Sequence, residues 1–218
     1  MDWSPLWISL KTSVTATVIT SVVGTFTAWK IARSNGRLKG LWDAVFTLPL
    51  VLPPTVVGYV LLMVFGKYTA IGSLLYSIGI NVPFTWAATV IASVVVSFPL
   101  MYKTARGAFE QIDENLINAA RTLGVPDVSL FFRVVLPLSW PGVAAGAVLA
   151  FARALGEFGA TVMLAGNISK VTTTMPVSIY FLVNNGRTDE ALVWVGITIV
   201  FSLTIMLIMN MRFDRKRR

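Results

Sequence analysis

Cysteine and histidine are absent from the sequence, and charged residues are few. The two absences exclude disulfides, thiolate and imidazole metal ligands, cysteine nucleophiles and the most common general base. The ten acidic residues are mostly scattered over polar segments, so no carboxylate pair for acid–base chemistry stands out. We therefore predict that the chain is not an enzyme and has no catalytic residue, no metal site and no cofactor of its own.

The composition is that of a membrane protein. Hydrophobic residues make up 56% of the 218 residues and charged residues only 13%, about half the charged share of a soluble domain. The mean hydropathy is +0.74. A spanning helix needs about 20 mostly apolar residues to cross about 30 Å of hydrocarbon. Five segments meet this requirement: 8–29, 43–66, 84–103, 141–165 and 190–211. We predict an all-α membrane protein with one domain, 1–218, and five transmembrane helices.

Basic residues are distributed unevenly around these segments. Thirteen of the 18 follow the first, third or fifth segment: Lys30, Arg33, Arg37, Lys39, Lys103, Arg106, Arg121, Arg133, Arg212, Arg215, Lys216, Arg217 and Arg218. The opposite side carries only Lys11, Lys67, Lys170 and Arg187. The positive-inside rule then places the N-terminus outside and the C-terminus in the cytoplasm. The net charge of +8 is thus a topology signal, and we do not expect nucleic-acid binding, because these residues flank spans.

Prolines interrupt the second predicted span. Pro49, Pro53 and Pro54 exclude one regular helix there. A helix that restarts at Pro53 inside the membrane would direct free N–H groups at a passing anion. The alternative is a kink that serves packing alone. On the first interpretation, hydroxyl groups along the same pathway wall would come from Thr55, Ser97 and Thr161.

The segment 104–140 is the only sizeable polar region and predicts a helix–Gly–helix elbow over 113–137. Asp113 and Glu114 favour a helix start, since negative charge suits the positive end of a helix. Leu116, Ala120 and Leu123 give that helix one apolar face. Gly124 ends it. A second short helix is expected from about Asp127 to Pro137.

Two ionisable residues fall within the fourth predicted span. Arg153 and Glu157 are four residues apart, which allows them to pair with each other near the centre of that span. They either line a translocation pathway or gate, together with Gly156, or form a buried ion pair that fixes helix packing. The residues alone leave both alternatives open.

Two further segments are too polar to span. We expect 67–83 to form an external loop with a short amphipathic piece around Leu74–Ile78. Segment 169–189 has a short apolar core and polar flanks, and is expected to be a re-entrant or external interfacial helix.

The elbow carries a recognisable motif. Asn118-Ala119-Ala120-Arg121-Thr122-Leu123-Gly124, followed after nine residues by Val134-Val135-Leu136-Pro137, resembles the cytoplasmic Glu-Ala-Ala loop of permease subunits of prokaryotic ATP-driven (ABC) importers. Further blocks resemble the molybdate permease subfamily: Leu48 to Tyr59, Ser97 to Met101, Phe151 to Thr161, and Asn167-Ile168 followed by Thr174 and Pro176. Sulfate and thiosulfate permeases share weaker versions of these blocks.

The resemblance implies an ABC importer subunit in the prokaryotic inner membrane that translocates molybdate or tungstate. Its expected partners are a second copy of itself, two ATP-binding cassette subunits that hold ATP and Mg²⁺, an external substrate-binding protein and the lipid bilayer. The elbow would couple to the ATPase through Asn118, Ala119, Ala120, Arg121, Leu123 and Gly124, although Asn118 stands where the motif usually has Glu. The pathway or gate would include Pro53, Pro54, Thr55, Ser97, Arg153, Gly156, Glu157 and Thr161. The alternatives are a sulfate or thiosulfate ABC permease and a stand-alone secondary transporter or channel.

Overall fold

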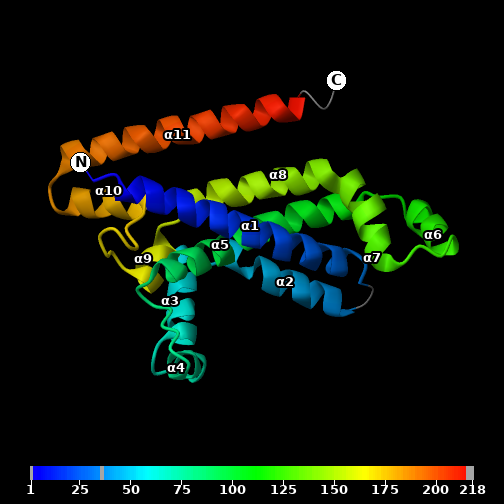
Figure 1. Cartoon of the computed structure of the whole chain (residues 1–218), viewed down its shortest axis with the longest axis horizontal. Helices are drawn as coiled ribbons and strands as arrows, with labels where there is room; N and C mark the ends of the chain where they lie inside the picture. Colours follow the sequence, from blue (N-terminus) through cyan, green and yellow to red (C-terminus); the bar gives the residue numbers. More distant parts are fainter. Residues whose placement is uncertain (1, 35–36, 215–218) are drawn as a thin grey trace.

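The computed structural model describes residues 2–34 and 37–214, and helices without strands make up its regular structure there (Figure 1). In chain order the helices are α1 Ser4–Ala32, α2 Arg37–Val51, α3 Pro54–Phe65, α4 Ala70–Ser77, α5 Trp86–Glu110, α6 Glu114–Thr122, α7 Asp127–Leu130, the π-helix η1 Phe131–Val135, α8 Leu136–Leu155, α9 Gly159–Ala165, α10 Met175–Asn184 and α11 Thr188–Asp214. The basic residues Arg215, Lys216, Arg217 and Arg218, which contribute to the predicted topology, lie outside the described residues.

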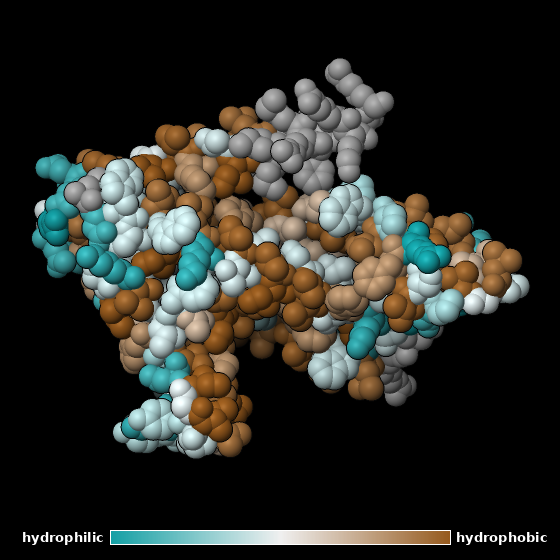
Figure 2. All heavy atoms as spheres, viewed as in Figure 1, coloured by the Kyte–Doolittle hydropathy of each residue, from teal (hydrophilic) through white to brown (hydrophobic). Residues whose placement is uncertain are grey.

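Four helices in this part of the chain are long and apolar enough to cross a membrane: α1, α5, the continuous helix Asp127–Leu155, and α11. A fifth crossing is counted if the bent pair α2 and α3 forms one span. The predicted count of five therefore depends on that pair. Figure 2 shows hydrophobic side chains over the middle of the long helices, with hydrophilic ones mostly towards the two ends.

The centre of the bundle is the contact of α1 with α5 and α8. Small side chains recur on α1 at every fourth position and are buried: Thr12, Ala16, Thr20, Gly24 and Ala28. A Cβ atom at Gly24 would come within 2.9 Å of the Met101 side chain, so the glycine lets α5 approach closely. Small residues in membrane helices allow this kind of backbone approach.

Hydroxyl pairs join the same two helices. Thr12 and Thr89 are hydrogen-bonded at 3.0 Å, and Thr20 and Ser97 at 3.3 Å. These side chains are almost wholly buried, so each hydroxyl satisfies the other where water is excluded. The pairs fix the register of α1 on α5.

The proline-rich segment is not one regular helix, as predicted, and its break lies at Pro53 and Pro54, whereas Pro49 lies inside α2. Helix α2 ends at Val51, α3 starts at Pro54, and the chain bends by 113° between them. Consecutive prolines supply no N–H group, and the residue before each proline is pushed out of the helical region. Figure 1 shows α3 projecting sideways from the long helices, with α4 at its tip. Helix α4 lies in the predicted external loop, slightly earlier than the amphipathic piece expected around 74–78.

The prediction that the second elbow helix stops at Pro137 is wrong. Helix α7 continues through η1 into α8, and Pro137 lies in the first turn of α8. Proline is tolerated in a first turn, and the wider turn of the π-helix changes the bond pattern just before it. The elbow is therefore continuous with a long apolar helix.

The predicted fourth span also ends early. Helix α8 stops at Leu155, three residues follow, and α9 covers the rest of the expected segment as a separate short helix. Segment 169–189 holds α10, which packs against α11 and α1. The backbone N–H of Met175 donates to the Ser9 hydroxyl of α1 at 2.7 Å, which anchors the start of α10.

Candidate functional site

Residues 113–124 of the predicted elbow form a capped helix followed by a sharp turn. The Asp113 carboxylate accepts a hydrogen bond from the backbone N–H of Asn115 at 2.9 Å and caps the start of α6. At the other end Gly124 has φ +75°, a conformation that glycine adopts without strain. Two backbone bonds close the turn, from Gly124 to Arg121 at 2.9 Å and from Val125 to Ala120 at 3.2 Å. Both predicted ends of the helix are confirmed.

Aromatic packing seats the elbow on the bundle. Leu130 and Phe131 are buried, and the Phe131 ring lies 5.6 Å from that of Trp29 and 6.2 Å from that of Phe109. Ile117 and Ala120 of α6 pack against the same cluster. Helices α7 and η1 are thus fixed to α1 and α5, and α6 is held at their edge.

The apolar face predicted for α6 does not pack as a unit. Of its three residues only Ala120 contacts the bundle, whereas Leu116 is 46% and Leu123 83% exposed. The side of α6 that packs against the bundle carries Ile117 and Ala120. Ile117 was not part of the predicted apolar face. Sequence periodicity identifies an apolar side but not the surface that it meets. Leu116 and Leu123 are therefore exposed apolar side chains on α6 and at its end, which we call the tip of the elbow.

The residues predicted to couple to an ATPase all belong to α6 or to the turn after it. Asn118, Ala119, Arg121, Leu123 and Gly124 are exposed, and Ala120 is half-buried. Arg121 Nη2 lies 3.5 Å from Asp127 Oδ1, across the turn. Because the Asp127 side chain is 67% exposed, this ion pair orients the turn more than it stabilises it.

The residues predicted for a pathway fall into two groups. The first group lies where the break between α2 and α3 meets the break between α8 and α9. Gly159 at the start of α9 lies against Pro54 and Thr55, and a Cβ atom there would come within 3.0 Å of the Pro54 side chain. Gly58 lies against Ala160 in the same way, because a Cβ atom on Gly58 would lie 2.7 Å from the Ala160 Cα. Close backbone contact therefore joins α3 to α9. Pro53 and Thr55 remain exposed beside this contact.

Arg153 and Glu157 form the predicted pair. Arg153 Nη1 lies 2.6 Å from Glu157 Oε2, and the glutamate side chain is 1% exposed. The other carboxylate oxygen accepts a hydrogen bond from the Ala160 N–H at 2.7 Å, in the first turn of α9. The pair does not lie inside one continuous helix, because α8 ends at Leu155 and the pair bridges the break that follows. Gly156 within this break is exposed.

The second group is buried in the packing of a single chain. Ser97 faces α1 through its hydrogen bond to Thr20 and is 0% exposed. Thr161 is 1% exposed, and its hydroxyl has no hydrogen-bond partner among the described residues. Neither hydroxyl lies on an open surface of this chain, in contrast to Thr55.

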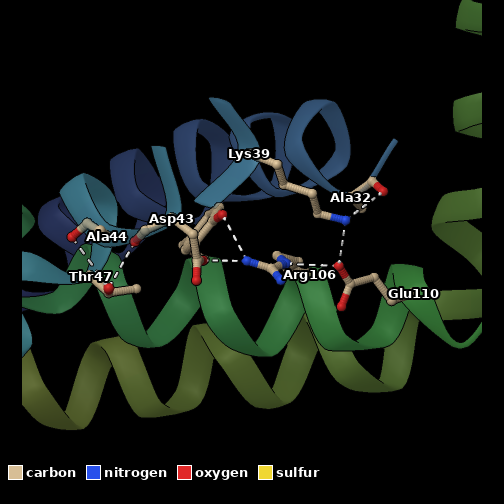
Figure 3. A network of polar contacts seen from close by, with 8 residues as sticks. Ala32, Lys39, Asp43, Ala44, Thr47, Arg106 and Glu110 are labelled. Carbon is tan, nitrogen blue, oxygen red and sulfur yellow. Dashed lines mark hydrogen bonds and ion pairs between the residues drawn. The ribbon is translucent and has the colours of Figure 1, made fainter. Parts of the chain in front are cut away.

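A charged network that the sequence did not suggest joins α2 to α5 (Figure 3). The Arg106 guanidinium contacts Asp43 and lies 2.9 Å from Glu110 Oε1. Lys39 lies 3.2 Å from the same glutamate and donates to the Ala32 carbonyl at 3.4 Å. Phe46 adds ring contacts to Phe98 and Tyr102 at 5.6 and 5.4 Å. The helix before the proline break is therefore held to the bundle by this network and one aromatic side chain.

The signal for this network was present but indirect. Asp43 opens an otherwise apolar segment, and an acid at such a position needs a partner. In the sequence, Arg106 and Lys39 were interpreted only as positive charges that indicate the membrane topology. Among the described residues, no three acidic side chains gather as a metal site would require.

Comparison with known proteins gives consistent matches. The model of the family described as "Binding-protein-dependent transport system inner membrane component" matches residues 20–218. The "Molybdenum transport system permease protein ModB" of Escherichia coli (strain K12) is 46% identical over 183 residues, which are 84% of this chain and 80% of that protein. The "Putative molybdenum transport system permease protein YvgM" of Bacillus subtilis (strain 168) is 40% identical over 205 residues, 94% of this chain and 90% of the relative.

A solved structure shares the fold. It is that of a bacterial ABC transporter involved in the import of the acidic polysaccharide alginate, with a TM-score of 0.76 over 97% of this chain and 78% of the other. At 17% identity this similarity concerns the fold alone.

Proposed function

Because the chain belongs to the family of inner membrane components of binding-protein-dependent transport systems, we propose that it is the permease subunit of an ATP-driven importer of molybdate or tungstate. The observation that carries the choice of substrate is the 46% identity to a molybdenum transport permease over most of both chains. The chain supplies the membrane pathway, and a partner subunit hydrolyses ATP.

The elbow is the proposed contact with that partner. Its tip presents Leu116 and Leu123 to solvent, and both ends of α6 are fixed by caps and by the contacts of Ile117 and Ala120. Exposed apolar groups on a rigid helix suit insertion into a groove of another protein. Since α7 continues into α8, a push on the tip would be transmitted directly to a long apolar helix.

The pathway is proposed to run beside the contact of α3 with α9, where Pro53 and Thr55 are exposed. The α3 start leaves the Thr55 N–H without a preceding helical carbonyl, and Thr55 is exposed at the break. A second copy of the chain would enclose this surface, and an external binding protein would deliver the anion. Two ATP-binding subunits, one on each elbow, would then drive the two permeases between outward and inward openings.

Uptake by the reconstituted complex tests the function. Vesicles that contain the permease, the ATP-binding subunit and the binding protein are expected to accumulate labelled molybdate when ATP is present. The permease alone should give only background uptake, because nothing in it hydrolyses ATP. Uptake of sulfate in preference to molybdate would assign the chain to sulfate transport, and uptake by the lone permease would indicate a secondary transporter or channel.

The absence of cysteine offers a test of the orientation with the elbow in the cytoplasm. Single Leu38→Cys and Tyr68→Cys variants place one thiol each at residues that are 66% and 95% exposed, and Leu38 lies outside the proposed contact with the ATP-binding subunit. In intact cells a membrane-impermeant thiol reagent is expected to label Tyr68→Cys and to label Leu38→Cys only after permeabilisation. Labelling of Leu38→Cys in intact cells would reverse the proposed orientation.

A further inference from the structure

A groove lies between the end of α1 and the elbow. Its volume is about 470 Å³, and its walls include Phe26, Trp29, Lys30, Arg33, Phe131 and Phe132. Phe26 is 42% and Phe132 51% exposed, so the apolar part of the groove is open to the surroundings. The groove therefore combines uncovered aromatic rings with two cations.

The groove continues an apolar stripe along α1. Val14, Val18, Val22 and Phe26 are each exposed by 42–59%, and their four-residue spacing places them on one side of the helix. Lys30 is the next residue in the same series and is also exposed. From Val14 to Phe26 the stripe rises about 18 Å, close to the roughly 15 Å of hydrocarbon in one bilayer leaflet. A ligand on this side would meet about a leaflet's depth of apolar surface and then a positive charge.

The charges in the groove leave an excess of one cation. Arg33 Nη2 lies 3.4 Å from Asp127 Oδ1, and the Arg33 guanidinium is held 4.5 Å above the Trp29 ring. Lys30 makes no ion pair among the described residues. The Trp29 ring fixes the Arg33 side chain. The ion pair of Arg33 with Asp127 is long, and the Asp127 side chain is 67% exposed, so an incoming anion can share the guanidinium with Asp127.

We propose that the groove binds an anionic phospholipid, with its headgroup phosphate between Lys30 and Arg33 and an acyl chain along the α1 stripe. The site rests on the proposed orientation, which puts the groove at the cytoplasmic leaflet, where anionic lipids attract basic residues. The amphiphilic pattern favours a lipid over a protein occupant, because the stripe extends far beyond the groove into the span. Bound lipid would compete with Asp127 for Arg33 and so contact the start of α7.

Native mass spectrometry of the purified complex with its ATP-binding subunits measures this binding directly. Phosphatidylglycerol is expected to be retained more strongly than phosphatidylcholine. Loss of both cations in a Lys30→Ala/Arg33→Ala variant should lower phosphatidylglycerol affinity about thirty-fold, since the contributions of the two cations multiply. Lys30→Ala alone breaks no ion pair and should give a smaller loss in a protein that folds normally. Phe132→Ala should weaken both lipids alike, because the acyl chains are common to them.

The matched control is Lys103→Ala, an exposed lysine on the same predicted side but outside the groove, which should change neither lipid. Equal retention of the two lipids, an unchanged Lys30→Ala variant, or displacement of the lipid when the ATP-binding subunits assemble would each overturn the proposal. The last outcome would assign the groove to the protein partner. Normal molybdate uptake without lipid selectivity would refute this site alone, whereas selective lipid binding without molybdate uptake would refute only the proposed function.

Discussion

A Leu123→Glu variant is expected to reach the membrane folded and to lose nearly all ATP-driven uptake. Leu123 is 83% exposed and contacts little of its own chain, so the substitution costs the isolated permease little. If the leucine is buried in a groove of the ATP-binding subunit, a carboxylate there is desolvated without a partner. A loss of about 2–4 kcal/mol, usual for a central interface residue, weakens the contact about 30- to 1,000-fold.

Two measurements test the Leu123→Glu variant: the amount of ATP-binding subunit that co-purifies with it, and its rate of molybdate uptake. Leu38→Glu is the matched control: Leu38 is 66% exposed and lies at the start of α2, outside the elbow. That variant should keep the partner bound. Retention of the ATP-binding subunit by Leu123→Glu would show that the tip is not the docking surface. Gly124→Trp is a less clean probe, because the positive φ of Gly124 strains any side chain whether or not a partner binds.

Features fixed by neighbouring residues were predictable from the sequence. The cap at Asp113 and the turn at Gly124 each depend on a few adjacent residues, and both occur as expected. The break at Pro53 follows from two consecutive prolines, since neither supplies an N–H group and each pushes the residue before it out of the helical region, whereas Pro49 and Pro99 each lie inside a helix. Its angle of 113° was not predictable, since the contact of Gly58 with α9 helps to fix it.

Features that depend on distant partners were missed. Asp43 and Arg106 are 63 residues apart, and neither identifies the other in the sequence. The burial of Ser97 reflects Thr20, which lies on another helix. Pro137 was misjudged for a different reason: it lies in the first turn of α8, directly after a π-helix, where proline is tolerated. Local rules thus located the elbow, but its exposed face depended on how the bundle covers it.

Removing the Glu157 carboxylate is expected to destabilise the permease strongly. The side chain is 1% exposed, neutralises Arg153 at 2.6 Å and accepts the Ala160 N–H at the start of α9. Glu157→Ala leaves a cation without its partner and an uncapped helix start, for which a cost of about 3–5 kcal/mol is usual. Thermal unfolding of the solubilised permease should therefore occur at a clearly lower temperature. In contrast, Glu190→Gln breaks an ion pair with Arg187 whose side chains are 47% and 59% exposed, and should change stability by about 0.5 kcal/mol or less.

A double Arg153→Met/Glu157→Gln variant separates the two roles that the sequence left open for this pair. It removes both charges, and the glutamine amide oxygen can still accept the Ala160 N–H, so much of the lost stability should return. We expect this variant to transport molybdate, because the carboxylate is buried and used to join α8 to α9 rather than presented to a pathway. A stable double variant without uptake would contradict that expectation, and would show that the Arg153 charge itself acts on the anion during its passage.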